Sequence, residues 1–309
     1  MSDVKYHLVL SGSGADFPCF LGAIRALQRN CIGLTQNLVS VSASSGGALV
    51  GLLLLLRFSM TVMEELCFTV EYQKHLQRIE LTNLLGEYGL DDASNMIKII
   101  KRVIRQKLGN ADATFADLYA FNPTLYNVTG TNLSTMSLMV FNHVKTPELS
   151  LWKAIRITTS VPLLFTSIRL GDDILCDGAI ICYYPLQLVP DLKQREEVIG
   201  LCLDKTDQRN VIDDLLSYIM ALAKTLTRHI HHLSSSKISM SYNYDRIDLK
   251  INEIEIYMME RNIEQKRALI DAGYTQTMAY LTSDVLVVRR LVRGIIGRVI
   301  ASIVLNEAQ

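Results

Sequence analysis

Short apolar runs of strand length alternate along the chain with longer stretches in which apolar residues recur at helical spacing. The pattern predicts a first strand over Tyr6–Ser11, a helix over Phe20–Arg29 and an apolar helix over Leu49–Leu56. A further helix is predicted over Asn95–Lys107. Because strands and helices alternate, we expect an α/β fold with three layers, α/β/α, around a mostly parallel central sheet.

The second half of the chain carries shorter elements. Apolar runs of strand length lie on either side of the turn residues Gly171-Asp172-Asp173, which predicts a hairpin there. The other predicted elements are strands over 124–132, 137–141 and 198–203, and a short helix over 151–158.

Composition permits a large core and gives no sign of a nucleic-acid partner. The chain has 309 residues, of which 49% are hydrophobic and 20% are charged. The formal net charge is zero, so no overall charge attracts the phosphate backbone of a nucleic acid.

The six cysteines are scattered and form no CxxC pair, which argues against a disulfide framework and against a zinc site. We therefore expect no metal and no other cofactor. A predicted strand stands where a signal peptide would be, and the longest apolar run, 48–56, is much shorter than a membrane span. The expected location is cytoplasmic.

A β-branched run followed by small residues stands just before the apolar helix, at Val39–Ala48. It contains the pattern small-x-Ser-x-Gly with Ser44 at its centre. A tight strand-to-helix turn of this kind holds a serine in a strained conformation with its hydroxyl exposed. Ser44 is therefore a candidate nucleophile, although a serine-rich turn without chemistry fits the same string.

A second turn, Gly12-Ser13-Gly14, joins the first strand to the first helix. The third glycine of a dinucleotide fingerprint is absent, and no Gly-Lys-Ser/Thr of a phosphate loop follows. The backbone N–H groups of such a turn can bind an oxyanion, and a plain tight turn fits equally well.

Asp177 follows an apolar strand and precedes Gly178. A carboxylate at the end of a strand in such a sheet is well placed to face a catalytic crevice, although Asp-Gly is also a common turn dipeptide.

Taken together and in order, these segments resemble the patatin-like phospholipase family over most of residues 6 to 283. The glycine turn resembles the family's oxyanion loop, the Ser44 turn its nucleophile elbow, and Asp177-Gly178-Ala179 its aspartate motif. The other similar segments are Thr131–Thr135 with Val140-Phe141, Ala154–Phe165, Pro185 and Ala272-Gly273-Tyr274.

The resemblance implies a lipid acyl hydrolase that uses a serine–aspartate dyad, an acyl-enzyme and no histidine. By this resemblance, Ser44 is the nucleophile and Asp177 its base, with oxyanion donors from Gly12, Ser13 and Gly14. The implied substrate is a phospholipid or another acyl lipid.

The sequence departs from the family where Asp16 and Phe17 replace a basic residue and glycine. A negative charge beside an oxyanion opposes its formation, so we expect low turnover and expect Asp16→Arg to raise kcat. This departure leaves a second interpretation open, in which the protein is a catalytically impaired member of the family that acts at membranes or binds protein. A Ser-His-Asp esterase using Ser44, Asp177 and His229 is a further alternative.

The family-like domain is expected to cover 1–283, and 284–309 forms a separate basic segment. Val285–Leu305 contains four arginines and no acid, with apolar residues at helical spacing. The pattern predicts an amphipathic helix that either packs on the domain or lies in a membrane interface as a peripheral contact.

Overall fold

A computed structural model describes residues 4–31, 33–69, 86–191, 196–206, 244–252 and 261–284, with short pieces at 212–213, 217–219, 221–222, 225–226 and 228–229. The predicted C-terminal helix over 285–309 lies outside these residues and stays a prediction.

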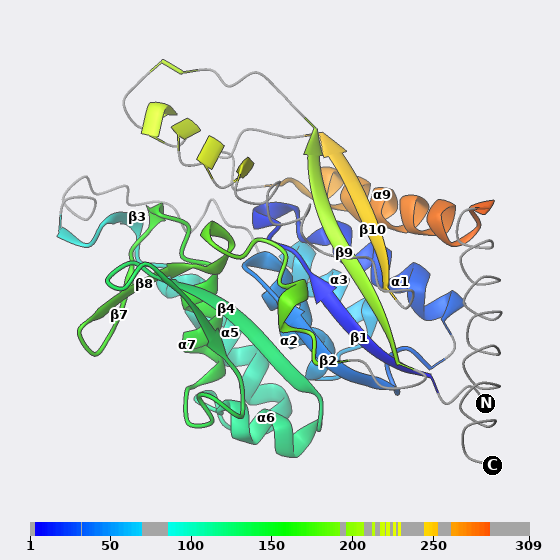
Figure 1. Cartoon of the computed structure of the whole chain (residues 1–309), viewed down its shortest axis with the longest axis horizontal. Helices are drawn as coiled ribbons and strands as arrows, with labels where there is room; N and C mark the ends of the chain where they lie inside the picture. Colours follow the sequence, from blue (N-terminus) through cyan, green and yellow to red (C-terminus); the bar gives the residue numbers. More distant parts are fainter. Residues whose placement is uncertain are drawn as a thin grey trace, which may run out of the picture.

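An eight-stranded sheet forms the centre of the molecule (Figure 1). Its strands follow the order β10-β9-β1-β2-β4-β8-β7, and β5 pairs with β4 beside this path. The five strands from β10 to β4 are parallel, whereas β5, β7 and β8 pair antiparallel. The strands are β1 (Lys5–Leu10), β2 (Leu38–Ala43), β4 (Leu125–Asn132), β5 (Ser137–Phe141), β7 (Ile168–Leu170), β8 (Asp173–Asp177), β9 (Glu196–Thr206) and β10 (Tyr244–Asn252).

The helices supply most of the apolar core against one face of this sheet. In Figure 1, α1, α2, α3 and α9 lie behind the sheet. The helices are α1 (Pro18–Asn30), α2 (Gly46–Leu55), α3 (Met60–Thr69), α5 (Ser94–Leu108), α6 (Phe115–Phe121), α7 (Leu151–Thr158) and α9 (Ile263–Leu281). Two short strands, β3 (Gly89–Asp91) and β6 (Leu163–Phe165), form a separate parallel pair.

The chain after Asp177 covers part of the other face of the sheet. Two 3₁₀ turns, η3 (Gly178–Ile180) and η4 (Leu186–Leu188), belong to this segment. Between them, Tyr184 packs with Val9 and Val198 of the sheet in a small apolar cluster. The sheet is thereby covered on both sides near its parallel strands.

The first and last helices of the described fold touch backbone to backbone. A Cβ on Gly22 of α1 would lie 1.8 Å from the carbonyl oxygen of Ile270, and one on Gly273 of α9 would lie 1.9 Å from that of Cys19. Only glycine fits at such a crossing. The contact ties residues near 270 to the helix that follows the first glycine turn.

Much of the predicted pattern is confirmed. The α/β class and the mostly parallel sheet are as expected, the helix predicted over 151–158 is α7, and the strand over 124–132 pairs with 137–141 as a hairpin. The turn at 171–173 joins β7 to β8. No helix in the described residues has the length and apolar character that crossing a membrane requires.

Candidate active site

The turn between β2 and α2 has the strained geometry of a nucleophile elbow, and its strained residue is Ser45. The backbone of Ser45 has φ 50° and ψ −130°, a region that residues with a side chain rarely occupy. Its N–H donates to the hydroxyl of Thr158 at 2.9 Å, which helps to hold this conformation.

Ser45 is also the serine that contacts the aspartate. Its Oγ donates to Oδ2 of Asp177 at 2.7 Å, and both side chains are buried. Ser44 is buried too, but its Oγ has no hydrogen-bond partner in the described part of the chain. The predicted pairing of Ser44 with Asp177 is therefore wrong by one residue, because the strained backbone of Ser45 brings its own side chain to Asp177.

Burial raises the pKa of Asp177 to about 7, whereas hydrogen bonds from Ser45 and from the Ala179 N–H lower it. The Ala179 N–H donates to Oδ1 at 2.8 Å, so each carboxylate oxygen has its own donor. The Asp177 N–H donates to the carbonyl of Ser160 at 3.0 Å. The carboxylate is thus fixed in orientation and has a pKa suited to taking a proton near neutral pH.

The glycine turn packs directly beside the elbow. A Cβ on Gly46, the residue after Ser45, would lie 2.3 Å from Oγ of Ser13 and 2.8 Å from the carbonyl oxygen of Gly14. Gly14 itself has φ +58°, where glycine is favoured. The predicted oxyanion loop and the strained serine are therefore neighbours.

The N–H groups of this loop are not equivalent. Gly12 donates its N–H to the carbonyl of Tyr183 at 2.8 Å, which removes it from the predicted set of oxyanion donors. Among the described residues, the N–H groups of Ser13, Gly14 and Gly46 have no hydrogen-bond acceptor. The available donors are these three, and Gly46 is the residue that the sequence interpretation missed.

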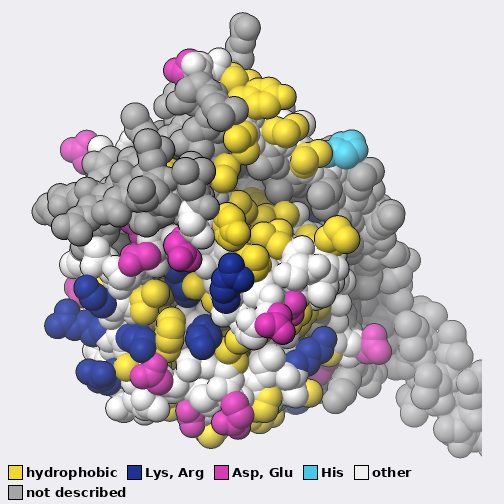
Figure 2. Space-filling model, turned by 90° about the vertical axis from the view of Figure 1, so that its left-hand side faces the viewer, with side chains coloured by type: hydrophobic (Ala, Val, Ile, Leu, Met, Phe, Trp, Pro, Cys, Tyr) yellow, Lys and Arg dark blue, Asp and Glu magenta, His cyan; other side chains and the backbone are white. Residues whose placement is uncertain are grey.

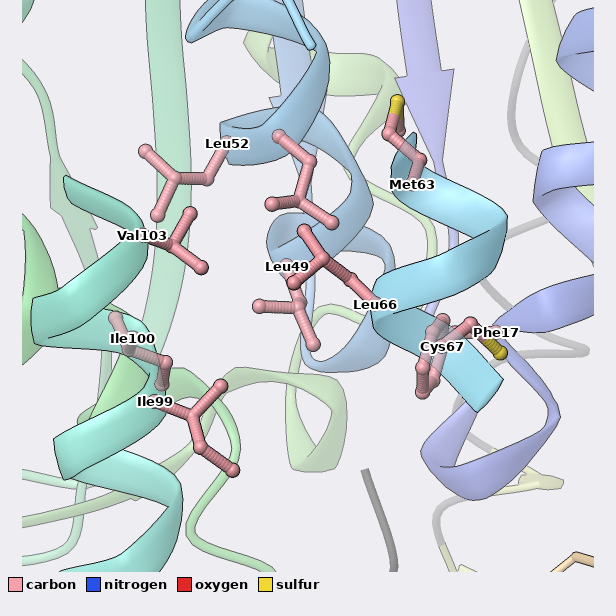
Figure 3. Close-up of a pocket in the computed structure, with 10 residues that line it drawn as sticks. Phe17, Leu49, Leu52, Met63, Leu66, Cys67, Ile99, Ile100 and Val103 are labelled. Carbon is pink, nitrogen blue, oxygen red and sulfur yellow. The ribbon is translucent and has the colours of Figure 1, made fainter. Parts of the chain in front are cut away.

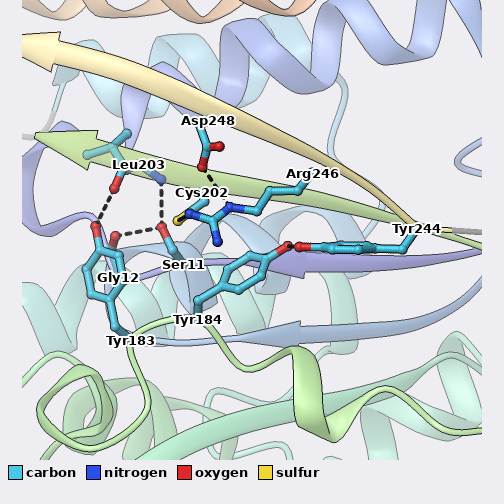
Figure 4. Close-up of polar contacts among 9 residues, drawn as sticks. All are labelled: Ser11, Gly12, Tyr183, Tyr184, Cys202, Leu203, Tyr244, Arg246 and Asp248. Atoms are coloured by element: carbon cyan, nitrogen blue, oxygen red, sulfur yellow. Dashed lines mark hydrogen bonds and ion pairs between the residues drawn. The ribbon is translucent and has the colours of Figure 1, made fainter. Parts of the chain in front are cut away.

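A hydrogen-bond network anchors the start of the loop to β9 (Figure 4). Ser11 donates its hydroxyl to the carbonyl of Gly12 and accepts from the N–H of Leu203, both at 2.9 Å. Tyr183 donates its hydroxyl to the carbonyl of Leu203 at 2.8 Å. The network fixes the position of Gly12 and with it the loop that follows.

The negative charge of Asp16 is paired. Oδ1 of Asp16 accepts from Nε of Arg261 at 2.9 Å and lies 2.8 Å from a terminal guanidinium nitrogen of the same residue. Both side chains are about 3% exposed. The charge of Asp16 is therefore not isolated. This pairing removes the reason given above for expecting low turnover and a higher kcat in Asp16→Arg.

Arg156 of α7 is a buried residue near the site that sequence reasoning did not single out. It is fully buried and donates to the hydroxyl of Ser160 and to the carbonyl of Thr166, the latter at 2.8 Å. Burial lowers the pKa of Arg156 to about 10. The guanidinium braces the segment whose Ser160 carbonyl accepts from Asp177.

An apolar pocket lies between α2, α3 and α5 (Figure 3). Its volume is about 40 Å³. Phe17, which follows the glycine turn, and Leu49, one helical turn beyond Ser45, form its wall on the side of the two loops. The remaining lining residues are Leu52, Leu53, Met63, Leu66, Cys67, Ile99, Ile100 and Val103.

Other candidate chemistry is not assembled in the described ranges. His229 is exposed and hydrogen-bonds to neither Ser45 nor Asp177, which contact each other directly. The Ser-His-Asp alternative is not formed. No group of three His, Cys, Asp or Glu side chains in the described residues is placed to hold a metal ion.

The family model for patatin-like phospholipases matches residues 8–189, which is more than half of the chain. The chain belongs to the patatin-like phospholipase family. The match includes the glycine turn, the elbow and Asp177.

Two viral proteins are similar to this patatin-like chain. An uncharacterized protein of Acanthamoeba polyphaga mimivirus is 26% identical over 284 residues, which cover 88% of this chain and 92% of that protein. A probable lipid hydrolase of Invertebrate iridescent virus 6 is 22% identical over 190 residues, covering 60% of this chain and 63% of that protein.

Solved structures share the fold. VipD from Legionella pneumophila matches with a TM-score of 0.53 and 17% identity, over 89% of this chain and 66% of VipD. The ExoU–SpcU complex of Pseudomonas aeruginosa matches with a TM-score of 0.50 and 17% identity, over 90% of this chain and 51% of the matched chain. This patatin-like chain therefore spans about two thirds of the one and half of the other.

Proposed function

We propose that this protein hydrolyses fatty acyl esters of lipids, with Ser45 as the nucleophile and Asp177 as the general base. The observation that carries the proposal is the direct hydrogen bond between Ser45 and the buried Asp177 at the strained elbow. Family membership and the similarity to a probable viral lipid hydrolase support the same reaction class.

In the first step Asp177 takes the hydroxyl proton while Oγ of Ser45 attacks the acyl carbonyl. The carbonyl oxygen becomes an oxyanion beside the glycine turn, where the N–H groups of Ser13, Gly14 and Gly46 are the available donors. Collapse of this intermediate breaks the ester bond, and Asp177 returns the proton to the departing alcohol.

In the second step water attacks the acyl-serine. Asp177 takes a proton from that water, and the same donors hold the new oxyanion. The fatty acid leaves when Ser45 recovers its proton from Asp177. Each step needs one proton acceptor within hydrogen-bond distance of the serine, which Asp177 provides without a histidine.

The test is hydrolysis of a soluble short-chain ester and of phosphatidylcholine vesicles by three matched variants. Ser45→Ala and Asp177→Asn are each expected to reduce kcat by roughly 10⁴-fold, because the two groups act as one unit. Ser44→Ala removes the neighbouring hydroxyl, which has no hydrogen-bond partner in the described residues, and is expected to keep near-normal turnover. Loss of activity in Ser44→Ala with retention in Ser45→Ala would overturn the assignment.

A fluorophosphonate probe, which reacts with activated serines, distinguishes the proposed hydrolase from a catalytically impaired member of the family. Reaction of the probe with the wild-type protein, at a serine identified by peptide mass as Ser45, is expected. A folded protein that neither reacts with the probe nor turns over either substrate would be a binding protein built on a hydrolase fold.

The predicted membrane contact through 284–309 also remains a proposal. Removing that segment is expected to weaken hydrolysis of vesicle lipid while leaving turnover of the soluble ester unchanged.

A further inference from the structure

Helix α5 borders two concave surfaces, one apolar and one basic. One is the apolar pocket against α2 and α3, and the other is a basic concavity that α5 itself lines. Ile99 belongs to both. The basic concavity is lined by Lys98, Ile99, Lys101, Arg102 and Arg105.

Helix α5 carries an excess of positive charge, which Asp112 offsets in part. Residues 94–108 contain five Lys or Arg and no Asp or Glu, although the whole chain is neutral. Lys101 donates to Asp112 at 2.6 Å. Lys98, Arg102 and Arg105 are exposed and form no ion pair within the described part of the chain.

The three exposed cations follow one another on a single face of the helix, since positions separated by three or four residues are neighbours. The opposite side of α5 is buried through Ile100, Val103 and Ile104. Folding of the helix therefore does not need the cations. Figure 2 shows one face of the molecule on which hydrophobic side chains gather centrally and Lys and Arg side chains gather to one side, with Asp and Glu more scattered.

The apolar pocket is lined in part by residues that adjoin both loops of the candidate active site. Its wall includes Leu49, one turn after Ser45 on α2, and Phe17, directly after the glycine turn. In Figure 3 the side chains of Ile99 and Ile100 from α5 face those of Leu49 and Leu66 across the space.

We propose that α5 docks this protein on an anionic lipid bilayer, with Lys98, Arg102 and Arg105 against the headgroups. The proposal rests on the proposed function for the choice of substrate, but docking itself needs no catalysis. Charge complementarity favours an anionic surface, and the proposed lipid substrate favours a bilayer over nucleic acid.

The experiment measures sedimentation with vesicles in the Ser45→Ala background, so that its result does not depend on turnover. The test variant is K98Q/R102Q/R105Q. The control is K5Q/K145Q/K250Q, which removes the same charge from exposed positions on β1, β10 and the loop after β5. Vesicles contain phosphatidylcholine with or without phosphatidylglycerol.

Each cation near an anionic surface contributes about fivefold in affinity, so the test variant is expected to bind phosphatidylglycerol vesicles roughly a hundredfold more weakly. The control variant is expected to bind within about threefold of its parent, and added salt to weaken the parent's binding. Circular dichroism checks that both variants are folded, which exposed glutamine substitutions on a helix should permit.

Equal weakening in test and control variants would overturn the proposal, as would unchanged binding in both. Loss of binding to a DNA oligonucleotide with unchanged vesicle binding would assign α5 to nucleic acid instead. With an active Ser45, the α5 variant is expected to hydrolyse the soluble ester normally. If neither protein hydrolyses that ester, the proposed function fails while the docking result stands.

Discussion

Asp177 couples the chemistry of the site to the stability of the fold. Burial raises its pKa from 3.8 to about 7, so the unfolded chain ionises at a lower pH than the folded protein. The stability associated with this group is therefore present below the unfolded pKa and is lost as the pH rises through the folded pKa. Asp177→Asn, which cannot ionise, should remove this pH dependence.

The magnitude follows from the two pKa values. Above pH 5 Asp177 is already ionised in the unfolded chain, whereas the folded protein keeps it protonated over about 2 further pH units. Between pH 5 and pH 8 this difference corresponds to about 2.5 kcal/mol in the free energy of unfolding. The wild-type protein should lose this much relative to Asp177→Asn over that interval. Comparing the two pH values for each variant cancels any constant effect of asparagine on packing or on the contacts with Ser45 and Ala179.

The assay is urea unfolding followed by circular dichroism at both pH values, with Ser45→Ala as a further control. The activity of the wild-type enzyme should rise over the same interval, because the base must be ionised. Parallel stability curves for wild type and Asp177→Asn would refute the reasoning, since Asp177 would then not change its charge in this range.

Further substitutions test the loop and its charge. Gly46→Ala places a Cβ against Ser13, so we expect kcat for a soluble ester to fall roughly a hundredfold through displaced oxyanion donors, with little change in KM. An unchanged kcat would mean that this contact does not position the donors. Arg261→Gln leaves Asp16 buried without its guanidinium, and the free energy of unfolding should fall by about 3 kcal/mol. Adding Asp16→Asn to this variant should restore part of that loss. Equal losses in the single and the double variant would argue against the ion pair. Asp16→Arg would bury two cations together and should destabilise the protein rather than raise kcat.

Local patterns were sufficient for most elements of the fold. The α7 helix, the hairpin of β4 and β5 and the turn at 171–173 are encoded by neighbouring residues, so periodicity and turn residues predicted them. The order of strands was not predictable in this way. β1 lies between β2 and β9, and β9 begins at residue 196, far along the chain.

The sequence pattern misplaces the serine that contacts Asp177 by one residue, because the string small-x-Ser-x-Gly fits twice. Ser42-x-Ser44-x-Gly46 and Ala43-x-Ser45-x-Gly47 both satisfy it. The backbone decides between them, since β2 ends at Ala43 and the positive φ falls on Ser45. Gly47 is the sequence signal that favours the second fit, centred on Ser45, because a Cβ on Gly47 would lie 2.3 Å from the carbonyl oxygen of Ser11.

The charge of Asp16 was misjudged for a different reason. Its partner Arg261 is 245 residues away, in a segment with no motif. The sequence interpretation gives Gly12 as an oxyanion donor, but its N–H donates to the carbonyl of Tyr183. Sequence patterns identify which residues are able to form a site, but pairings between distant segments decide which groups remain available.

The pairing of Asp16 with Arg261, together with the glycine contact between α1 and α9, has a consequence during synthesis on the ribosome. The elbow and Asp177 leave the ribosomal exit tunnel while Arg261 and α9 are still to be translated. Until they emerge, the carboxylate beside the glycine turn lacks its cation and α1 lacks its partner helix. Under the proposed function, the nascent chain would therefore carry Ser45 and Asp177 before the glycine turn is fully supported, and we expect hydrolysis to begin only after the last described helix has docked.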